Sequence, residues 1–188
     1  MKCSISIPAS MNKQLQKHLF RNHLEQGAFL FTYVVGSSEN SLRLEATEMY
    51  LIPPEGWEVQ SDVHLEMKDA ERAKIMKMAR NGKHAIIDCH SHPGSHDHVE
   101  FSASDRAGIA DFSAYAKWKL PGQPYTAMVW GEMSVDAVVW HGAFEQARHV
   151  HEVILAGRNM SRVLVPRGTW FSRRSLRGRK LRLTKHEN

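Results

Sequence analysis

Two histidines at the end of an apolar segment constrain this chain more than any other feature of its sequence. The residues around Ala85-Ile86-Ile87 predict a strand over 84–90, and the chain continues as His90-Ser91-His92-Pro93-Gly94. Because side chains alternate along an extended backbone, His90 and His92 are expected on one face. Pro93-Gly94 then ends the strand. Both imidazoles can therefore reach one metal ion.

A carboxylate follows after a polar loop. The segment Ser102-Ala103-Ser104-Asp105 predicts the start of a helix over 104–117, with Ser104 as its N-cap. Catalytic zinc usually takes three protein ligands with nitrogen or oxygen donors and leaves one position open. The sequence therefore predicts one zinc ion per chain, held by His90, His92 and Asp105.

Hydrolysis at such a site also needs a base and an oxyanion donor. Ser102 is the predicted donor, since it lies one helical turn before Asp105. Glu25 is the predicted base, because it opens the aromatic and β-branched run 25–35, which is typical of a buried central strand. Four other acids compete with Glu25 for this role: Glu39, Glu45, Glu48 and Glu55.

The other histidines of this region receive a different interpretation. His96-Asp97-His98 resembles the metallo-β-lactamase pattern, but Asp97 follows His92 by five residues where that pattern requires two. We expect His96 and His98 in a solvated loop, with a contact to substrate left open. His84 is predicted at a strand edge. Cys89 is expected to point away from His90 as a core thiol.

Together these residues resemble the JAB/JAMM (MPN-type) zinc metalloprotease family. The resemblance rests on Glu25 before a Gly-Ala-Phe-Leu strand, on His90-Ser91-His92-Pro93, and on Ser102-x-x-Asp105, and it covers roughly residues 1–145. It implies that His90, His92 and Asp105 bind zinc, that Glu25 is the base and that Ser102 is the oxyanion donor. The nine residues between His92 and Ser102 are more similar to prokaryotic members of the family.

The resemblance also implies a substrate. It predicts an isopeptidase or peptidase that cleaves the amide bond after the C-terminal tail of a ubiquitin-like protein, in a bacterial conjugation system of antiviral defence, with the cognate activating and conjugating enzymes as partners. Two alternatives remain open: an amidase acting on small peptides or processing sulfur carriers, and a non-catalytic MPN-type interaction module.

Length and composition are consistent with one globular domain. The chain has 188 residues, of which 42% are hydrophobic and 24% charged, and no apolar run approaches the roughly 20 residues that span a bilayer. Two cysteines, Cys3 and Cys89, are too few for a disulfide framework, so a cytoplasmic location is expected.

The remaining pattern predicts a mixed α/β (α+β) domain with a central mixed sheet flanked by helices. The family resemblance adds a cytidine-deaminase-like layering. Trp130 and Trp140 are expected in the core. The predicted strands cover residues 2–7, 25–35, 41–52, 84–90, 125–130 and 135–140, the last two as an antiparallel pair; the helices cover 10–23, 69–81 (stopped by Gly82) and 104–117.

Charge divides the chain into two parts. Residues 158–188 hold ten lysines or arginines and one acid, a net charge of +9, which leaves −4 for residues 1–157 of a chain with net charge +5. We therefore predict a catalytic domain over 1–157 and a basic C-terminal extension over 158–188. A solvated extension is favoured, and binding to nucleic acid or to an acidic partner is the alternative. Because Val163-Leu164-Val165 and Trp170-Phe171 interrupt the charges, packing of part of the extension on the domain or on another subunit is also left open.

Overall fold

The computed structural model describes residues 2–38, 40–142, 146–157 and 161–166. Its helices are α1 (Ala9–Leu19), α2 (Asp69–Gly82) and α3 (Ala103–Lys119), with a short 3₁₀ turn, η1 (Pro54–Gly56). Its strands are β1 (Lys2–Pro8), β2 (Gly27–Ser38), β3 (Ser41–Leu51), β4 (Trp57–Gln60), β5 (Leu65–Met67), β6 (Ala85–Ser91), β7 (Tyr125–Trp130), β8 (Val135–Trp140), β9 (Arg148–His149), β10 (Glu152–Ala156) and β11 (Ser161–Leu164).

Within these ranges, nine strands form one curled sheet in the order β11-β10-β1-β3-β2-β6-β7-β8-β9. The sheet is mixed: β1 runs parallel to β3 and β10, and β6 runs parallel to β7, whereas β2 is antiparallel to both of its neighbours. The strands β4 and β5 form a separate hairpin. The predicted mixed α+β class is confirmed, as is the antiparallel pairing of β7 with β8.

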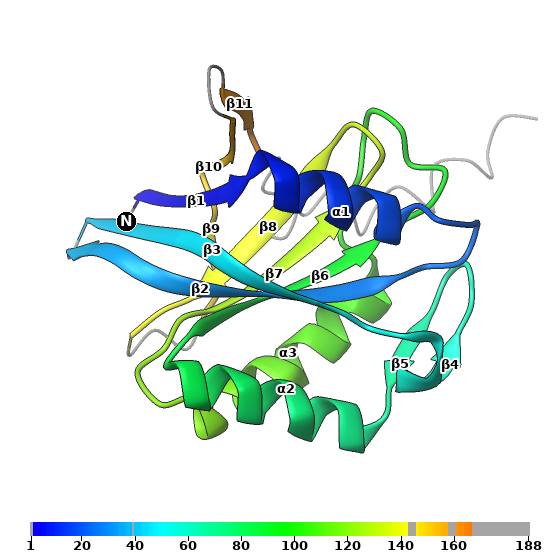
Figure 1. The fold of residues 1–188 in the computed structure, drawn as a ribbon, viewed down its shortest axis with the longest axis horizontal. Coiled ribbons are helices and arrows are strands. Elements are labelled where there is room, and N and C mark those ends of the chain that lie inside the picture. The colour runs from blue at the N-terminus through cyan, green and yellow to red at the C-terminus, as the bar shows by residue number, and fades with distance from the viewer. Residues whose placement is uncertain (1, 39, 143–145, 158–160, 167–188) are drawn as a thin grey trace, which may run out of the picture.

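Helices cover both faces of the sheet. In Figure 1, α1 lies over one face, and α2 and α3 lie over the other. The first layer buries Leu15 and Leu19 of α1 against β1 and β3, and the second buries Ile75 and Ile109 of α2 and α3. Trp130 and Trp140 are buried in the core, as predicted.

Three helix boundaries differ from the sequence prediction. The helix α1 ends at Leu19 instead of residue 23: Phe20 leaves the helical conformation while still packing against the core, and Asn22 accepts a hydrogen bond from the Leu24 backbone N–H. Gly82 is the last residue of α2, and Lys83 ends it in the left-handed conformation (φ 55°). Ser102, not Ser104, is the N-cap of α3.

The strand β11 belongs to the stretch 158–188 that the sequence predicts as a basic extension. It pairs antiparallel with β10, so residues 161–164 continue the sheet. The rest of that prediction falls mainly on residues 158–160 and 167–188, which lie outside the described residues. No helix in the described part of the chain has both the length and the hydropathy needed to cross a bilayer.

Candidate metal centre

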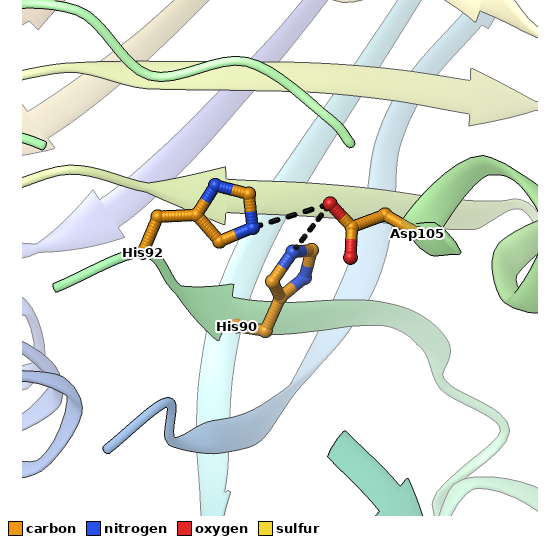
Figure 2. Close-up of side chains that lie close together, drawn as sticks. All are labelled: His90, His92 and Asp105. Carbon is orange, nitrogen blue, oxygen red and sulfur yellow. Dashed lines mark ion pairs between the residues drawn. The ribbon is translucent and has the colours of Figure 1, made fainter. Parts of the chain in front are cut away.

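Two imidazoles and one carboxylate converge at the end of β6. The Nε2 atoms of His90 and His92 lie 3.5 Å and 3.2 Å from the same oxygen, Oδ2 of Asp105. Figure 2 shows both rings turned toward that oxygen, the histidines from β6 and the turn after it, the aspartate from α3. One donor atom from each of the three residues lies within 4.8 Å of the other two, so the group could hold a metal ion.

Backbone contacts fix the two histidines. His90 pairs with Gly27 of β2 and with Val129 of β7, so it lies in the interior of the sheet. His92 follows the strand, and its backbone N–H donates to the carbonyl of Trp130 at 2.9 Å. The turn that follows requires Gly94, whose φ of 83° is a conformation that favours glycine. The predicted end of the strand at Pro93-Gly94 is therefore confirmed.

Asp105 is held by the first turn of α3. Its Oδ2 accepts from the Ser102 backbone N–H at 2.6 Å, while the Ser102 Oγ accepts from the Asp105 backbone N–H at 3.1 Å. This reciprocal capping box stabilises the helix start and orients the carboxylate toward the histidines. Ser102 is exposed and accepts through its oxygen, so its hydroxyl hydrogen is left to donate elsewhere.

Glu25 joins this group from the segment before β2. Its Oε1 lies 3.5 Å from the Nε2 of His92, and its side chain is only 7% exposed. The Glu25 backbone is tied to the end of β4 and the residue after it: its N–H donates to the Ser61 carbonyl at 2.8 Å, and its carbonyl accepts from the Gln60 side-chain amide at 2.8 Å. The structure thus brings all five residues predicted from the sequence to one place.

The charges of the cluster shift its pKa values in opposite directions. Burial raises the pKa of Glu25, and nearby His90 and His92 only partly offset this. Burial opposes ionisation of Asp105, but the imidazoles of His90 and His92 beside its carboxylate outweigh it and hold its pKa well below the ordinary value. Burial also opposes protonation of His90, yet Asp105 outweighs it and the pKa of His90 is raised. Asp105 and His90 therefore stabilise one another's charged forms, whereas Glu25 is shifted toward its protonated form.

The donor set fits a metal ion. The Nε2 of His90 is buried and makes no hydrogen bond to any described residue, although Asp105 lies nearby. Such an unsatisfied nitrogen is costly unless it has a ligand. Two imidazole nitrogens with one carboxylate are a donor set that suits zinc and leaves a position open.

A cavity of about 770 Å³ opens beside the cluster. Glu25, His90 and Asp105 form part of its wall, together with Trp57 of β4 and residues of α3. These three side chains therefore face a space of the size that small ligands occupy in proteins.

The competing candidates lie elsewhere. Glu45, Glu48 and Glu55 are exposed, and Glu39 lies outside the described residues. His96 and His98 are exposed in the loop, as predicted, and His96 pairs with the adjacent Asp97 at 2.8 Å.

The two remaining sequence predictions concern residues next to β6. Cys89 is fully buried in the layer under α1, on the opposite side of β6 from His90, and burial raises its pKa well above the ordinary value; it is the predicted core thiol. His84 lies just before β6, with its side chain buried instead of at an open edge.

The sequence prediction missed Asp88, which lines the same cavity. One of its carboxylate oxygens accepts a hydrogen bond from the Tyr125 hydroxyl at 3.1 Å. Burial raises the pKa of Asp88 to about 6, with His90 and the Tyr125 hydrogen bond acting in the other direction. The alternation that aligns His90 with His92 also aligns Asp88 with His90, so the signal was present in the sequence.

No protein-family model matches this chain, and no curated protein matches it in sequence. Among solved structures, the chain is similar to a protein from Desulfitobacterium hafniense whose solution structure was determined as a structural genomics target. The two share 16% identity over 82% of this chain and 94% of that chain, with a TM-score of 0.49. The name of that protein states no ligand or activity, so the chemistry of the site rests on its own geometry.

Proposed function

We propose that this chain is a zinc-dependent isopeptidase or peptidase of the JAB/JAMM (MPN) type. The observation that supports it best is the convergence of Glu25 with His90, His92 and Asp105 beside one cavity, whose wall includes Glu25, His90 and Asp105. A scaffold has no need for a buried acid beside a metal-ligand set. The sheet with helices on both faces is compatible with the MPN-like layering that this proposal implies.

In the proposed reaction, His90, His92 and Asp105 hold the ion. Bound zinc would supply Lewis-acid chemistry, which polarises the scissile carbonyl and makes water a better nucleophile near neutral pH. Glu25 accepts the proton of the attacking water and passes it to the leaving amine. The Ser102 hydroxyl donates to the oxygen on which negative charge develops, a contact worth roughly 3 kcal/mol in other hydrolases. This scheme forms no acyl-enzyme.

The proposed substrate is the extended C-terminal tail of a ubiquitin-like protein, joined to a lysine ε-amine or to a precursor extension. The cavity supports this, since residues from β4, β5, α2 and α3 line it beside the cluster and its volume of about 770 Å³ can hold a segment of a peptide chain. The proposed setting is the bacterial cytoplasm, with the activating and conjugating enzymes of the same system as partners.

The decisive experiment separates metal binding from hydrolysis. We expect purified protein to hold about one zinc per chain and Glu25→Gln to keep that zinc while losing at least about 100-fold in kcat. Glu55→Gln, which changes an exposed acid, is the matched control and should retain full activity. A Glu25→Gln variant that stays fully active would contradict the assignment of the base.

Substrate size is tested by comparing two probes. One is a ubiquitin-like protein joined through its tail to a lysine, and the other is the tail peptide alone with the same amide bond. Preference for the intact protein supports the isopeptidase, whereas equal rates on both favour the small-peptide amidase.

A further inference from the structure

Asp88 is a carboxylate in a layer that is otherwise mostly apolar. It projects from β6 on the same side as His90, and its register partners are Phe29 on β2 and Ala127 on β7, both fully buried. The aromatic ring of Phe112 packs over Phe29 from α3. A carboxylate in such surroundings loses hydration and needs polar partners to compensate.

The partners that the fold supplies are incomplete. Within the described residues, Asp88 receives one hydrogen bond, from the Tyr125 hydroxyl to its Oδ2. An ionised carboxylate can accept about four hydrogen bonds through its two oxygens. Because Asp88 also lines the cavity, its remaining capacity is available to a molecule bound there.

The other charged groups that line the cavity either have partners or, like Asp111, lie exposed at its rim. Asp105 pairs with the two histidines, and Glu25 contacts His92. The guanidinium of Arg72, which lines the same wall, pairs with Asp69 at 3.4 Å. The interior carboxylate of Asp88 is therefore left as the natural counter-charge for a cation that enters the cavity.

The surrounding side chains suit the stem of such a cation. Trp57, Leu65, Met67 and Tyr115 line the cavity and offer apolar surface. Arginine and lysine bury an aliphatic stem against surface of this kind while the charged end reaches a polar partner. Asp88 and His90 are two residues apart on one strand, so their Cα atoms are about 6.6 Å apart. An extended substrate advances by about two residues over that distance.

We propose that Asp88 is a specificity-determining residue that binds a basic side chain of the substrate, arginine or lysine, about two residues from the cleaved bond. This inference rests on the proposed function for the identity of the ligand, a peptide segment with a scissile amide. It adds a charge requirement that the metal cluster alone does not impose.

The test uses two quenched fluorescent peptides that differ only by arginine or its neutral isostere citrulline at that position. Binding is measured by fluorescence polarisation to the zinc-loaded, full-length Glu25→Gln variant, which isolates recognition from turnover. We expect the arginine peptide to bind at least about tenfold more tightly than the citrulline peptide. Adding Asp88→Asn should remove this preference, because asparagine can still accept from Tyr125 but carries no charge.

Asp111→Asn is the matched control, since it removes a negative charge from the exposed rim of the same cavity. It should change the preference by less than about twofold, because exposed charges are screened by solvent. Thermal melting of each variant verifies its fold. Equal binding of the two peptides, a preference that survives Asp88→Asn, or a preference that Asp111→Asn removes would each overturn the proposal.

Hydrolysis of the same peptides by the wild-type protein keeps the two proposals separate. Binding that depends on Asp88 without any cleavage leaves the basic-side-chain site standing and contradicts the peptidase. Cleavage without an Asp88-dependent preference supports the peptidase and contradicts the role of Asp88.

Discussion

The two faces of β6 have the same backbone and opposite chemistry. On one side, Ala85, Ile87 and Cys89 are fully buried against the layer under α1. On the other side, Asp88 and His90 follow Ile86 and open onto the cavity between the sheet and α3. Strand alternation thus lets one strand of seven residues complete a closed core on one face and contribute to the candidate metal site on the other.

The difference between the faces comes from how each helix layer is filled. Leu15 and Leu19 of α1 close the first face with apolar side chains. On the second face, the start of α3 brings Asp105 and Ser102 to the end of β6. His90 is the last residue of β6 on this face. This layer therefore holds the polar residues of the candidate metal site at one end and keeps an apolar core at the other.

The largest expected effect comes from substituting His90, on the face of β6 that opens onto the cavity. His90→Ala removes one of three ligands, so bound zinc should fall to a small fraction of one per chain and hydrolysis by at least about 1,000-fold. Elemental analysis and a rate assay on the same sample measure both quantities.

Cys89→Ala, which changes the neighbouring residue on the opposite face of β6, is the control for His90→Ala. It deletes one buried sulfur from the closed face and should cost about 1 kcal/mol of stability while leaving the zinc content unchanged. Zinc loss in Cys89→Ala at an unchanged fold would show that the two faces are not independent.

A smaller effect, on stability, is expected from substituting Gly27 at the start of β2. A Cβ on Gly27 would lie 2.6 Å from the indole of Trp57, which lines the cavity, so Gly27→Ala forces the ring to move. We expect a loss of about 2 kcal/mol in unfolding free energy, as for other overpacked sites. Urea denaturation followed by tryptophan fluorescence measures it.

The adjacent Ala28 faces the closed layer and supplies the comparison. Ala28→Gly removes a buried methyl group and should cost about 1 kcal/mol without altering the rate of hydrolysis. Gly27→Ala, in contrast, should lower that rate, because Gly27 pairs directly with His90. Equal rates for the two variants would contradict a link between Trp57 and the metal face.

The third effect combines stability and rate. Ser102→Ala removes the N-cap of α3, which should cost about 1 kcal/mol, and removes the proposed oxyanion donor, which should lower kcat by about 100-fold. Ser102→Thr keeps a hydroxyl and should largely restore both. A Ser102→Ala variant that loses stability but keeps full kcat would contradict the role of Ser102 as oxyanion donor and leave only its role as N-cap.

The sequence predicted the local parts of this architecture well. The strands β7 and β8 and the ends of β3 and β6 follow from alternation and turn residues, to within one residue. The ligand set was predictable because residue types and spacing near His90 restrict the geometry. The position of Glu25 followed from the family resemblance, and the structure agrees with a contact at 3.5 Å.

Other features depend on long-range contacts that spacing does not encode. Ser104 was predicted to cap α3 because both serines precede the helix, but only Ser102 is positioned to exchange hydrogen bonds with Asp105. The parallel pairing of β1 with β10 joins residues near the two ends of the described chain. Alternation places Asp88 on the same face as His90, but only the structure shows that this face opens onto a cavity.

The smallest expected effect lies on the closed face, where α1 contributes one buried imidazole. The Nε2 of His18 lies 3.0 Å from the Gly27 carbonyl, and burial lowers the pKa of His18, with Arg21 adding to this and the Gly27 contact opposing it. The unfolded chain therefore binds a proton more readily than the folded one, so acidification from pH 7 through the ordinary histidine range should reduce stability. His18→Gln, whose amide can still donate to Gly27, should flatten this part of the dependence of unfolding free energy on pH. His23→Gln, at an exposed position just beyond α1, should leave it unchanged. Because the sheet separates His18 from the metal cluster, the zinc content should be the same in both variants. A His18→Gln variant with the wild-type pH dependence would show that His18 does not cause the loss of stability in acid.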